Sequence, residues 1–304
     1  MEHIIEVEHL QKSYGNVKAV KDVSFYVEPG KLFAFLGPNG AGKSTTINSI
    51  CTFLKPDSGK VTVNGYTLGQ QDDEIRKSIG TVFQESLLDD LLTVKENLEL
   101  RGSFYHMNKR QLQEAIKWVS RVTEIEDFLN RPYEKLSGGQ RRRADIARGL
   151  IHTPKILFLD EPTTGLDPQT RKNVWDTIRK LQTTNGMTVF LTTHYMEEAQ
   201  EADYCIIVDN GMVAEKGTPF ELKEKFAKDR LQLKWKNEAT LKEKLNGEHI
   251  YFNEKADYLE VSLQNTMEAL PVLDLCRNDI DGFGVIKGSM DDVFLNITGK
   301  EIRE

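Results

Sequence analysis

The sequence predicts a parallel α/β domain that carries a mostly helical insertion and is followed by a small α+β domain. Short apolar runs, each followed by a polar or glycine-rich turn, indicate buried strands at residues 32–36, 156–159, 188–191 and 205–208. Segments of helix length, such as residues 169–182 and 195–201, alternate with them as in a parallel sheet. At 304 residues the chain exceeds what one hydrophobic core usually organises, so we expect two domains.

The helical insertion is expected at residues 86–149, where strand-like runs are few and helical patterns are several. Turn signals at Gly211 and Gly217 close the larger domain, and residues 221–230 have the pattern of a charged connecting helix. These signals predict a larger domain at residues 1–230 and a small domain at residues 231–304.

The small domain is expected to run strand, helix, two strands, helix, strand, helix, which resembles a split βαβ unit. Apolar residues alternate at Leu231, Leu233 and Trp235, and alternate again in residues 258–263. Ser289 with Asp292 three residues later has the spacing of a capping box, which predicts the start of a final helix.

Composition excludes several classes of protein. The formal net charge of -7 argues against broad nucleic-acid binding, so we expect no nucleic-acid partner. The cysteines Cys51, Cys205 and Cys276 form no CxxC pair and suggest neither a zinc site nor a disulfide framework, which fits a reducing, cytosolic setting. The first ten residues lack the pattern of an export signal, and no apolar run approaches the roughly 20 residues that span a bilayer. Any role at a membrane therefore needs a partner.

A glycine-rich loop follows the first apolar run and precedes a helical stretch, as a phosphate-binding loop requires. It consists of Gly37, Pro38, Asn39, Gly40, Ala41, Gly42, Lys43, Ser44 and Thr45. Its backbone N–H groups and the following helix dipole favour an anion. Lys43 is expected to contact the β and γ phosphates of a nucleotide, and Ser44 to offer a hydroxyl to Mg²⁺. The alternative is an ordinary strand-to-helix turn, which the intact Gly-Lys-Ser ending disfavours.

Two further strand ends carry polar residues. The run at residues 156–159 ends in Asp160 and Glu161, and strand ends are where α/β sheets place ligands. We expect Asp160 to hold Mg²⁺ and Glu161 to polarise the water that attacks the γ-phosphate. Alone, this pair is typical of a solvated loop. His194 follows the strand at residues 188–192, so we expect a γ-phosphate contact, although a lone histidine there is usually structural.

A second candidate anion site lies at the start of a helix formed by Leu136, Ser137, Gly138, Gly139 and Gln140, followed by three arginines. Paired glycines at a helix N-terminus leave N–H groups for phosphate oxygens, although the same residues are consistent with a simple capped helix. One ATP seldom needs two such sites. The pattern therefore predicts a head-to-tail dimer of two copies with two nucleotides at the interface. The arginines are expected on a solvated or paired helix face.

These motifs together resemble the nucleotide-binding subunits of ABC transporters, from about Ile4 to Glu221. The resemblance implies a P-loop NTPase fold of the ABC type, with ATP and Mg²⁺ as ligands and active hydrolysis, because Glu161 is present. It also implies an integral-membrane permease as partner and a location at the cytoplasmic face of the cell membrane. By resemblance, the motif of Leu136 to Gln140 is the family signature. Gln84 links Mg²⁺ to the permease, His194 is the switch histidine, Asp167 communicates across the dimer, and Tyr14 stacks on adenine. Tyr14 is equally consistent with a turn residue packed on the early sheet.

The residues from Ser289 to Gly299 resemble the closing segment of the drug-resistance and lipid-export branch, which favours an exporter over an importer. A capped amphipathic helix without that kinship has the same polarity pattern. Residues 84–92, with leucine pairs at 87–88 and 91–92, are expected to receive a short helix of the permease. A soluble ABC ATPase acting on ribosomes or DNA is the second hypothesis, disfavoured because neither a second nucleotide-binding domain nor a long coiled coil is present. A non-hydrolysing ATP sensor is disfavoured by Glu161.

Overall fold

The structure is a computed structural model that describes residues 2–193 and 195–299. Two compact units make up the chain, Met1–Lys216 and Gly217–Glu304, and each is described by itself. The division lies earlier than residue 230, the boundary that the sequence predicted. The helix α8 (Pro219–Phe226) packs against α11 (Met290–Thr298) of the second unit, and Asn296 Nδ2 donates to the carbonyl of Phe226 at 2.7 Å. The charged connecting helix therefore belongs to the second unit.

The first unit is built on a sheet whose order, in the described residues, is β5-β4-β1-β2-β10-β9-β3-β8-β7-β6. Its parallel part contains the runs that the sequence predicted, as β6 (Ile79–Val82), β7 (Ile156–Asp160), β8 (Thr188–Thr192), β3 (Leu32–Leu36) and β9 (Tyr204–Asp209). An antiparallel part contains β1 (Ile5–Tyr14), β2 (Val17–Val27), β4 (Ser58–Val63) and β5 (Tyr66–Thr67), and β10 (Met212–Gly217) joins the two parts.

The parallel strands are mostly apolar and almost entirely buried, as expected where both faces of a sheet are covered. Phe33, Phe35, Phe158 and Phe190 lie in one cluster, and the ring centroid of Phe190 is 5.0 to 5.6 Å from those of the other three. The packed rings hold the strand ends at one edge of the sheet in a rigid frame.

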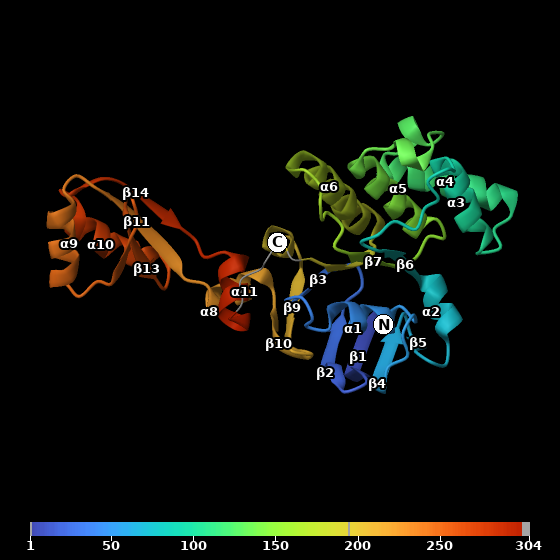
Figure 1. The fold of residues 1–304 in the computed structure, drawn as a ribbon, viewed down its shortest axis with the longest axis horizontal. Coiled ribbons are helices and arrows are strands. Elements are labelled where there is room, and N and C mark those ends of the chain that lie inside the picture. Colours follow the sequence, from blue (N-terminus) through green and yellow to red (C-terminus); the bar gives the residue numbers. More distant parts are fainter. Residues whose placement is uncertain (1, 194, 300–304) are drawn as a thin grey trace. The chain divides into compact units, whose positions relative to one another are not determined.

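The predicted helical insertion is confirmed, since the chain between β6 and β7 forms helices (Figure 1). They are α3 (Val94–Ser103), α4 (Lys109–Thr123) and α5 (Gly138–Leu150), with short 3₁₀ helices at Glu126–Phe128 and Tyr133–Lys135. The remaining helices of the unit are α1 (Lys43–Ile50), α2 (Asp72–Ser78), α6 (Pro168–Asn185) and α7 (Met196–Gln200).

The second unit has the predicted order of elements. After α8 come β11 (Asp229–Trp235), α9 (Glu238–Gly247), β12 (Phe252–Glu254), β13 (Leu259–Leu263), α10 (Ala269–Cys276), β14 (Ile280–Ile286) and α11. The antiparallel sheet has the order β12-β13-β11-β14, so β13 lies between the two strands that α9 connects. This is the split βαβ arrangement. The predicted capping box is also present, because Ser289 Oγ accepts from Asp292 N at 3.2 Å.

Candidate functional site

A cleft of about 610 Å³ opens at the carboxyl ends of the parallel strands in the first unit. Four of the predicted functional side chains line it together, namely Lys43, Gln84, Asp160 and Glu161. Asn39, Gly40, Gly42, Ser44 and Thr45 of the predicted loop also line it, as do Val17, Lys18, Ala19, Lys21 and Asn210, which the sequence analysis did not single out. Lys18 and Lys21 add positive charge beside the loop.

The loop between β3 and α1 needs glycine at two positions for different reasons. Gly42 has φ +100°, and a Cβ there would lie 2.5 Å from the carbonyl oxygen of Ala19. A Cβ on Gly37 would lie 2.4 Å from the carbonyl oxygen of Val208 on β9. The loop therefore follows its path only without these side chains, which leaves backbone N–H groups accessible at the start of α1.

Lys43 lies beneath this loop and is 8% exposed. Its Nζ donates to the carbonyl oxygens of Gly37 at 2.6 Å and Pro38 at 3.1 Å. Burial lowers the pKa of this ammonium, while the charges of Glu161 and Asp160 raise it in part. The cation is thus held at the base of the cleft, beside two carboxylates.

Asp160 and Glu161 lie at the end of β7, next to Thr192 of β8. Thr192 Oγ1 donates to Asp160 Oδ1, and Glu161 N donates to the Thr192 carbonyl at 3.1 Å. Glu161 has φ +46°, a left-handed conformation that costs a non-glycine residue about 1 kcal/mol or more. Backbone strain of this kind concentrates at functional sites, and here it occurs at the predicted catalytic base.

The cleft also offers the right atoms for a hard cation. The Ser44 hydroxyl, the Gln84 amide oxygen and the Asp160 carboxylate are all oxygen donors, which Mg²⁺ prefers, and all three residues line the same cleft. The protein offers few ligands, as is usual for Mg²⁺ that is bound together with a nucleotide phosphate.

The second predicted anion site is not among the residues that line this cleft. Ser137 caps α5 by accepting from Gln140 N, and Asp167 caps α6 by accepting from Thr170 N at 3.1 Å. The two helix starts lie side by side, since a Cβ on Gly139 would meet Thr170 Cγ2 at 2.3 Å. The signature residues, among them Gly138 and Gln140, and Asp167 are therefore grouped with each other rather than with Lys43.

Arg142 was expected on a solvated or paired helix face, and that expectation is wrong. Its guanidinium is buried and donates to the carbonyl oxygens of Pro162 at 2.6 Å, Asp160 at 3.0 Å and Phe83. Burial lowers the pKa of Arg142, and the charge of Asp145 makes the largest contribution in the opposite direction. A helix wheel cannot identify this residue because its partners come from two other strand ends.

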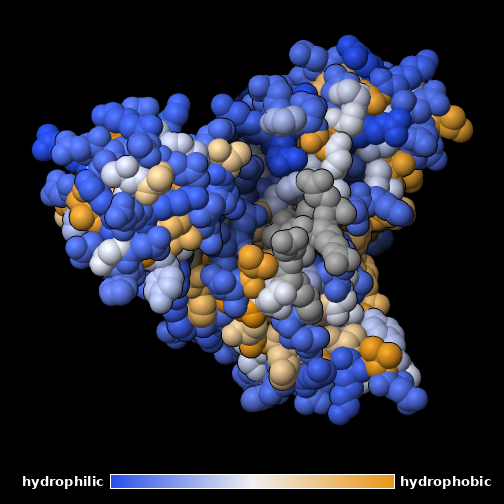
Figure 2. Space-filling view, turned by 60° about the vertical axis from the view of Figure 1, so that its left-hand side comes forward, coloured by the Kyte–Doolittle hydropathy of each residue, from blue (hydrophilic) through white to orange (hydrophobic). Residues whose placement is uncertain are grey.

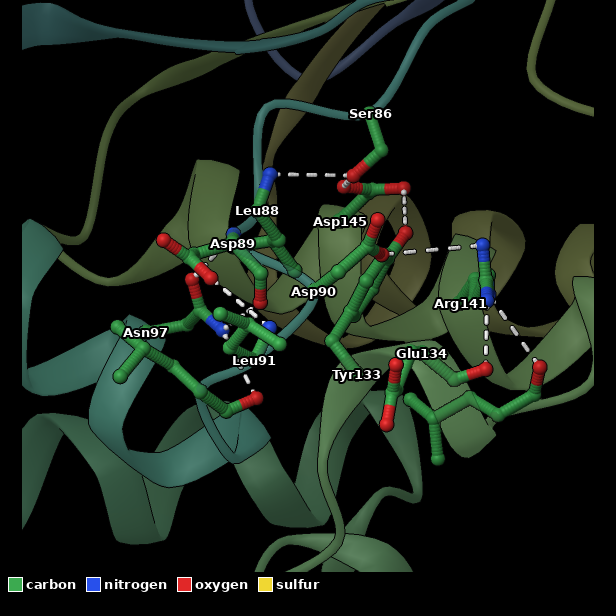
Figure 3. Close-up of polar contacts among 12 residues, drawn as sticks. Ser86, Leu88, Asp89, Asp90, Leu91, Asn97, Tyr133, Glu134, Arg141 and Asp145 are labelled. Atoms are coloured by element: carbon green, nitrogen blue, oxygen red, sulfur yellow. Dashed lines mark hydrogen bonds and ion pairs between the residues drawn. The ribbon is translucent and has the colours of Figure 1, made fainter.

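Asp145 forms a second connection from α5 to the segment after Gln84 (Figure 3). Its carboxylate accepts from Ser86 Oγ at 2.7 Å and from Tyr133 OH at 3.1 Å. Burial raises the pKa of Asp145, and its hydrogen bonds and the neighbouring arginines oppose the rise. The same segment is held at its other end by Asn97 Oδ1, which accepts from Asp89 N at 2.8 Å.

Tyr14 and His194 are the two remaining residues that the sequence predicted to contact the nucleotide. Tyr14 is half exposed at the end of β1, where it pairs with Val17 of the cleft lining, but Tyr14 itself is not among the residues that line the cleft. His194 lies outside the residues that the structure describes.

Comparisons with known proteins match both units. The family profile described as "ABC transporter" matches residues 20–164, and that of "ATP-binding protein DrrA1-3-like, C-terminal domain" matches residues 217–298. The chain is 36% identical to the daunorubicin/doxorubicin resistance ATP-binding protein DrrA of Streptomyces peucetius, over 97% of this chain and 92% of that protein. It is 34% identical to the linearmycin resistance ATP-binding protein LnrL of Bacillus subtilis, over 99% of this chain and all (100%) of that protein.

Solved structures agree with these relatives. The cassette cbiO1 of Clostridium perfringens superposes with a TM-score of 0.68 at 29% identity, covering 73% of this chain and 91% of that one. A dimeric post-hydrolysis cassette, MJ0796 bound to ADP and Pi, superposes with a TM-score of 0.64 at 32% identity, covering 70% of this chain and 98% of that one. With the site geometry, these matches show that the chain belongs to the ATP-binding subunits of ABC transporters, which bind and hydrolyse ATP to power transport.

Proposed function

We propose that two copies of this chain close head to tail on two ATP molecules and drive a separate integral-membrane permease that exports a drug-like or lipid-like compound. One observation carries the proposal. Lys43, Gln84, Asp160 and Glu161 share a cleft, whereas the signature residues that begin at Ser137 do not line it. A second copy that presents Ser137 to this cleft completes the site.

Within one copy, the backbone N–H groups of the loop from Asn39 to Thr45 receive the phosphates, and the Lys43 ammonium contacts the β and γ phosphates. Glu161 polarises the attacking water, and the carboxylate is suited to this because it lies beside the phosphate loop at the end of a rigid strand. His194 contacts the γ-phosphate. Tyr14 stacks on adenine, supported by its half-exposed ring beside the cleft-lining residue Val17.

Mg²⁺ fits the oxygen donors of Ser44, Gln84 and Asp160. When bound, the ion neutralises charge on the phosphates of ATP. Ser44 lies at the start of α1 and Asp160 at the end of β7, so the two donors approach from different elements. The hydrogen bond from Thr192 orients the Asp160 carboxylate.

From the opposite copy, the N–H groups at Ser137, Gly138, Gly139 and Gln140 face the γ-phosphate of the first copy's ATP. Asp167 lies at the start of α6 beside this segment, where it is exposed and placed to sense the dimer contact. The dimeric cassette MJ0796 supports association of two copies.

Among the described residues, no helix is long and apolar enough to cross a membrane. A permease would therefore supply the pathway, and the chain would act at the cytoplasmic face of the membrane. The docking surface is residues 84–92, where Leu87 and Leu91 are exposed while the backbone is held by Asp145 and Asn97. The relatives DrrA and LnrL are named for resistance to daunorubicin/doxorubicin and to linearmycin, which supports export of a drug-like compound.

The first experiment is to tag the chain, solubilise membranes in mild detergent and identify what co-purifies. Recovery of a multispanning membrane protein supports the proposal, and recovery of ribosomes or soluble factors alone refutes it. Replacing Glu161 with Gln in the purified complex is expected to reduce ATP turnover by about 10²-fold or more while ATP binding persists, because the amide cannot act as a base. Turnover equal to the unchanged complex would show that Glu161 is not the base.

A further inference from the structure

Glu198 of α7 is one of two acidic side chains that the structure describes as buried, the other being Asp145. It is 2% exposed, whereas charged side chains usually remain in water, as they do on the mostly hydrophilic face in Figure 2. Its Oε1 accepts a hydrogen bond from the hydroxyl of Thr163. Its Oε2 is buried and has no hydrogen-bond partner among the described residues. Burying a carboxylate with one donor is costly, so packing alone does not account for this residue.

The donor, Thr163, lies in the turn that joins Glu161 to Asp167. Its side chain is fully buried. The next residue, Thr164, donates from its hydroxyl to Glu161 Oε2 at 3.2 Å. The turn that Glu198 holds therefore carries the proposed catalytic base at its start and Asp167 at its end.

A second contact joins the start of α6 to the residue after His194. The guanidinium Cζ of Arg171 lies 4.0 Å from the centroid of the Tyr195 ring. This distance is within the range of a cation–π interaction, which is stronger where the two groups are partly shielded from water, as both are here. Arg171 N also donates to the carbonyl of Asp167, the N-cap of the helix, at 2.9 Å. The cation–π contact therefore reaches the same turn from its far end.

The segment that contains His194 is held on both sides, although His194 itself is outside the described residues. The chain reaches it from Thr192, the last residue of β8, whose carbonyl accepts from Glu161 N at 3.1 Å. It leaves through Tyr195 and Glu198, which the two contacts above hold. The position of this segment is thus fixed relative to the strand end and turn that carry the base.

Four side chains connect the chain after His194 to the turn between the base and the dimer contact: Thr163, Arg171, Tyr195 and Glu198. We propose that these clamp residues keep His194 aligned with Glu161 and Asp167, so that a γ-phosphate contact at His194 moves the base and the dimer contact together. They are positioning residues, because none of them is among the residues that line the nucleotide cleft. The proposal rests on the roles that the proposed function gives to His194, Glu161 and Asp167.

The test is steady-state ATP hydrolysis by the full chain with matched substitutions at both contacts. Thr163→Val removes the hydroxyl at nearly constant size, and Thr163→Ser keeps it. Tyr195→Leu removes the aromatic ring, and Tyr195→Phe keeps it. Thr163→Val and Tyr195→Leu are each expected to lower kcat by about tenfold with an unchanged KM for ATP, because catalytic groups shift while the phosphate loop does not. Thr163→Ser and Tyr195→Phe are expected to retain kcat within about twofold.

Urea unfolding of the same variants separates positioning from a purely structural role. If Thr163→Val and Tyr195→Leu lower the midpoint of unfolding but keep the native kcat, the contacts only stabilise the fold and the proposal is overturned. Equal kcat for Tyr195→Phe and Tyr195→Leu also overturns it, since the ring is then not the group that matters. Tyr195 and Arg171 are only partly buried, so their variants are expected to fold even if Thr163→Val does not.

A double-mutant cycle identifies the contact itself. Arg171→Met with Tyr195→Leu is expected to lower kcat no further than either single change, because each removes the same interaction. Additive losses would overturn the cation–π contact as the cause.

His194→Ala and Asp167→Ala distinguish failure of the clamp from failure of the proposed function. If both lower ATP turnover and the clamp variants do not, the clamp is wrong and the roles of His194 and Asp167 stand. If His194→Ala leaves turnover unchanged, the role given to His194 is wrong, and the clamp proposal falls with it.

Discussion

The hydroxyl of Ser86 donates to the carboxylate of Asp145 at 2.7 Å, and this contact joins the segment after Gln84 to the helix that begins at the signature residues. Tyr133 donates to the other oxygen of the same carboxylate at 3.1 Å. One buried acid thus links the segment that we propose as the docking surface for the permease to the helix that we propose contacts the second nucleotide. Arg142 links the same helix to the strand ends on either side.

The first prediction concerns Ser86 and Asp145. Ser86→Ala is expected to lower the free energy of unfolding by about 1–2 kcal/mol, because it removes a hydrogen bond to a charged acceptor. Asp145→Ala is expected to cost about 3 kcal/mol or more, since it removes the counter-charge that acts most strongly on the buried Arg142. Urea unfolding of both single variants and the double variant measures the coupling. Ser103→Ala is the control, because that hydroxyl is exposed and donates only within its own helix. Additive effects would contradict the link.

The second prediction concerns Arg142. Arg142→Lys retains the charge but cannot reach three carbonyl oxygens on two segments, so the backbone around Glu161 shifts. ATP turnover is expected to fall by about tenfold or more while nucleotide binding persists, since small misplacements of catalytic groups are costly. Steady-state kinetics measures both. Arg143→Lys is the matched control, because the Arg143 guanidinium contacts the carbonyl and side chain of Glu124 and the ring of Phe128, all of them away from the strand ends. Equal kinetics for the two variants would show that Arg142 does not position the site.

The third prediction tests the head-to-tail arrangement. Ser137→Asp keeps an N-cap acceptor for α5 but adds a negative charge where the γ-phosphate of the other copy should lie. Lys43→Ala damages the phosphate loop instead. Each homodimer then lacks an intact composite site, whereas a mixed dimer has one. Mixing the two inactive variants is expected to restore part of the ATP turnover. If mixed dimers form, as tags on each variant report, and remain inactive, the composite-site arrangement is wrong.

The fourth prediction concerns docking of the permease. Leu87 and Leu91 are 61% and 81% exposed, so replacing both with Ala should change the free energy of unfolding by about 0.5 kcal/mol or less. Recovery of the membrane partner with the tagged chain is expected to fall strongly, while ATP turnover of the chain alone is unchanged. Leu100→Ala with Phe104→Ala removes comparable exposed apolar area elsewhere in the insertion and serves as control. If recovery of the partner is undiminished, the docking surface does not lie at Leu87 and Leu91.

The fifth prediction concerns acid stability. His152 stacks on Tyr105 with centroids 4.0 Å apart, and its Nε2 donates to the Ile79 carbonyl at 2.8 Å. Burial lowers the pKa of His152 from the ordinary 6.5 of a histidine to about 4, although the hydrogen bond to Ile79 opposes the shift. Protonation would also place a hydrogen on Nδ1 of His152. This atom is buried and has no hydrogen-bond partner among the described residues, so the new N–H would be unpaired.

The direction of the pH effect follows from the lowered pKa. Because the folded chain prefers the neutral imidazole, the contribution of His152 to the free energy of unfolding is full above about pH 6.5 and is lost as the pH falls towards 4. The loss is expected to reach about 3 kcal/mol. His152→Gln keeps an N–H donor but cannot titrate, so urea unfolding at pH 7 and pH 4.5 should show a smaller drop than in the unchanged chain. His249→Asn, an exposed position, is the control. If all three proteins lose the same free energy of unfolding between pH 7 and pH 4.5, His152 is not a source of the acid sensitivity.

The sequence by itself determined the phosphate loop, the carboxylates at the end of β7, the helical insertion and the order of elements in the small domain. These are local patterns, in which residue type and spacing suffice because each depends on a single strand, turn or helix. Burial along both faces of the parallel strands also follows from their unbroken apolar runs, and the capping box at Ser289 follows from two residues three apart.

Only the tertiary structure decided which of these pieces meet. It brought Gln84 to the cleft of Lys43 and Asp160, and it left the signature residues outside that cleft. It also placed Arg142 in the interior and α8 in the second unit, against two expectations from the sequence. A helical face of arginines looks the same in sequence whether it meets water or three carbonyl oxygens, because its partners at Phe83, Asp160 and Pro162 are far away along the chain. Contacts between distant segments depend on packing, and no local spacing encodes them.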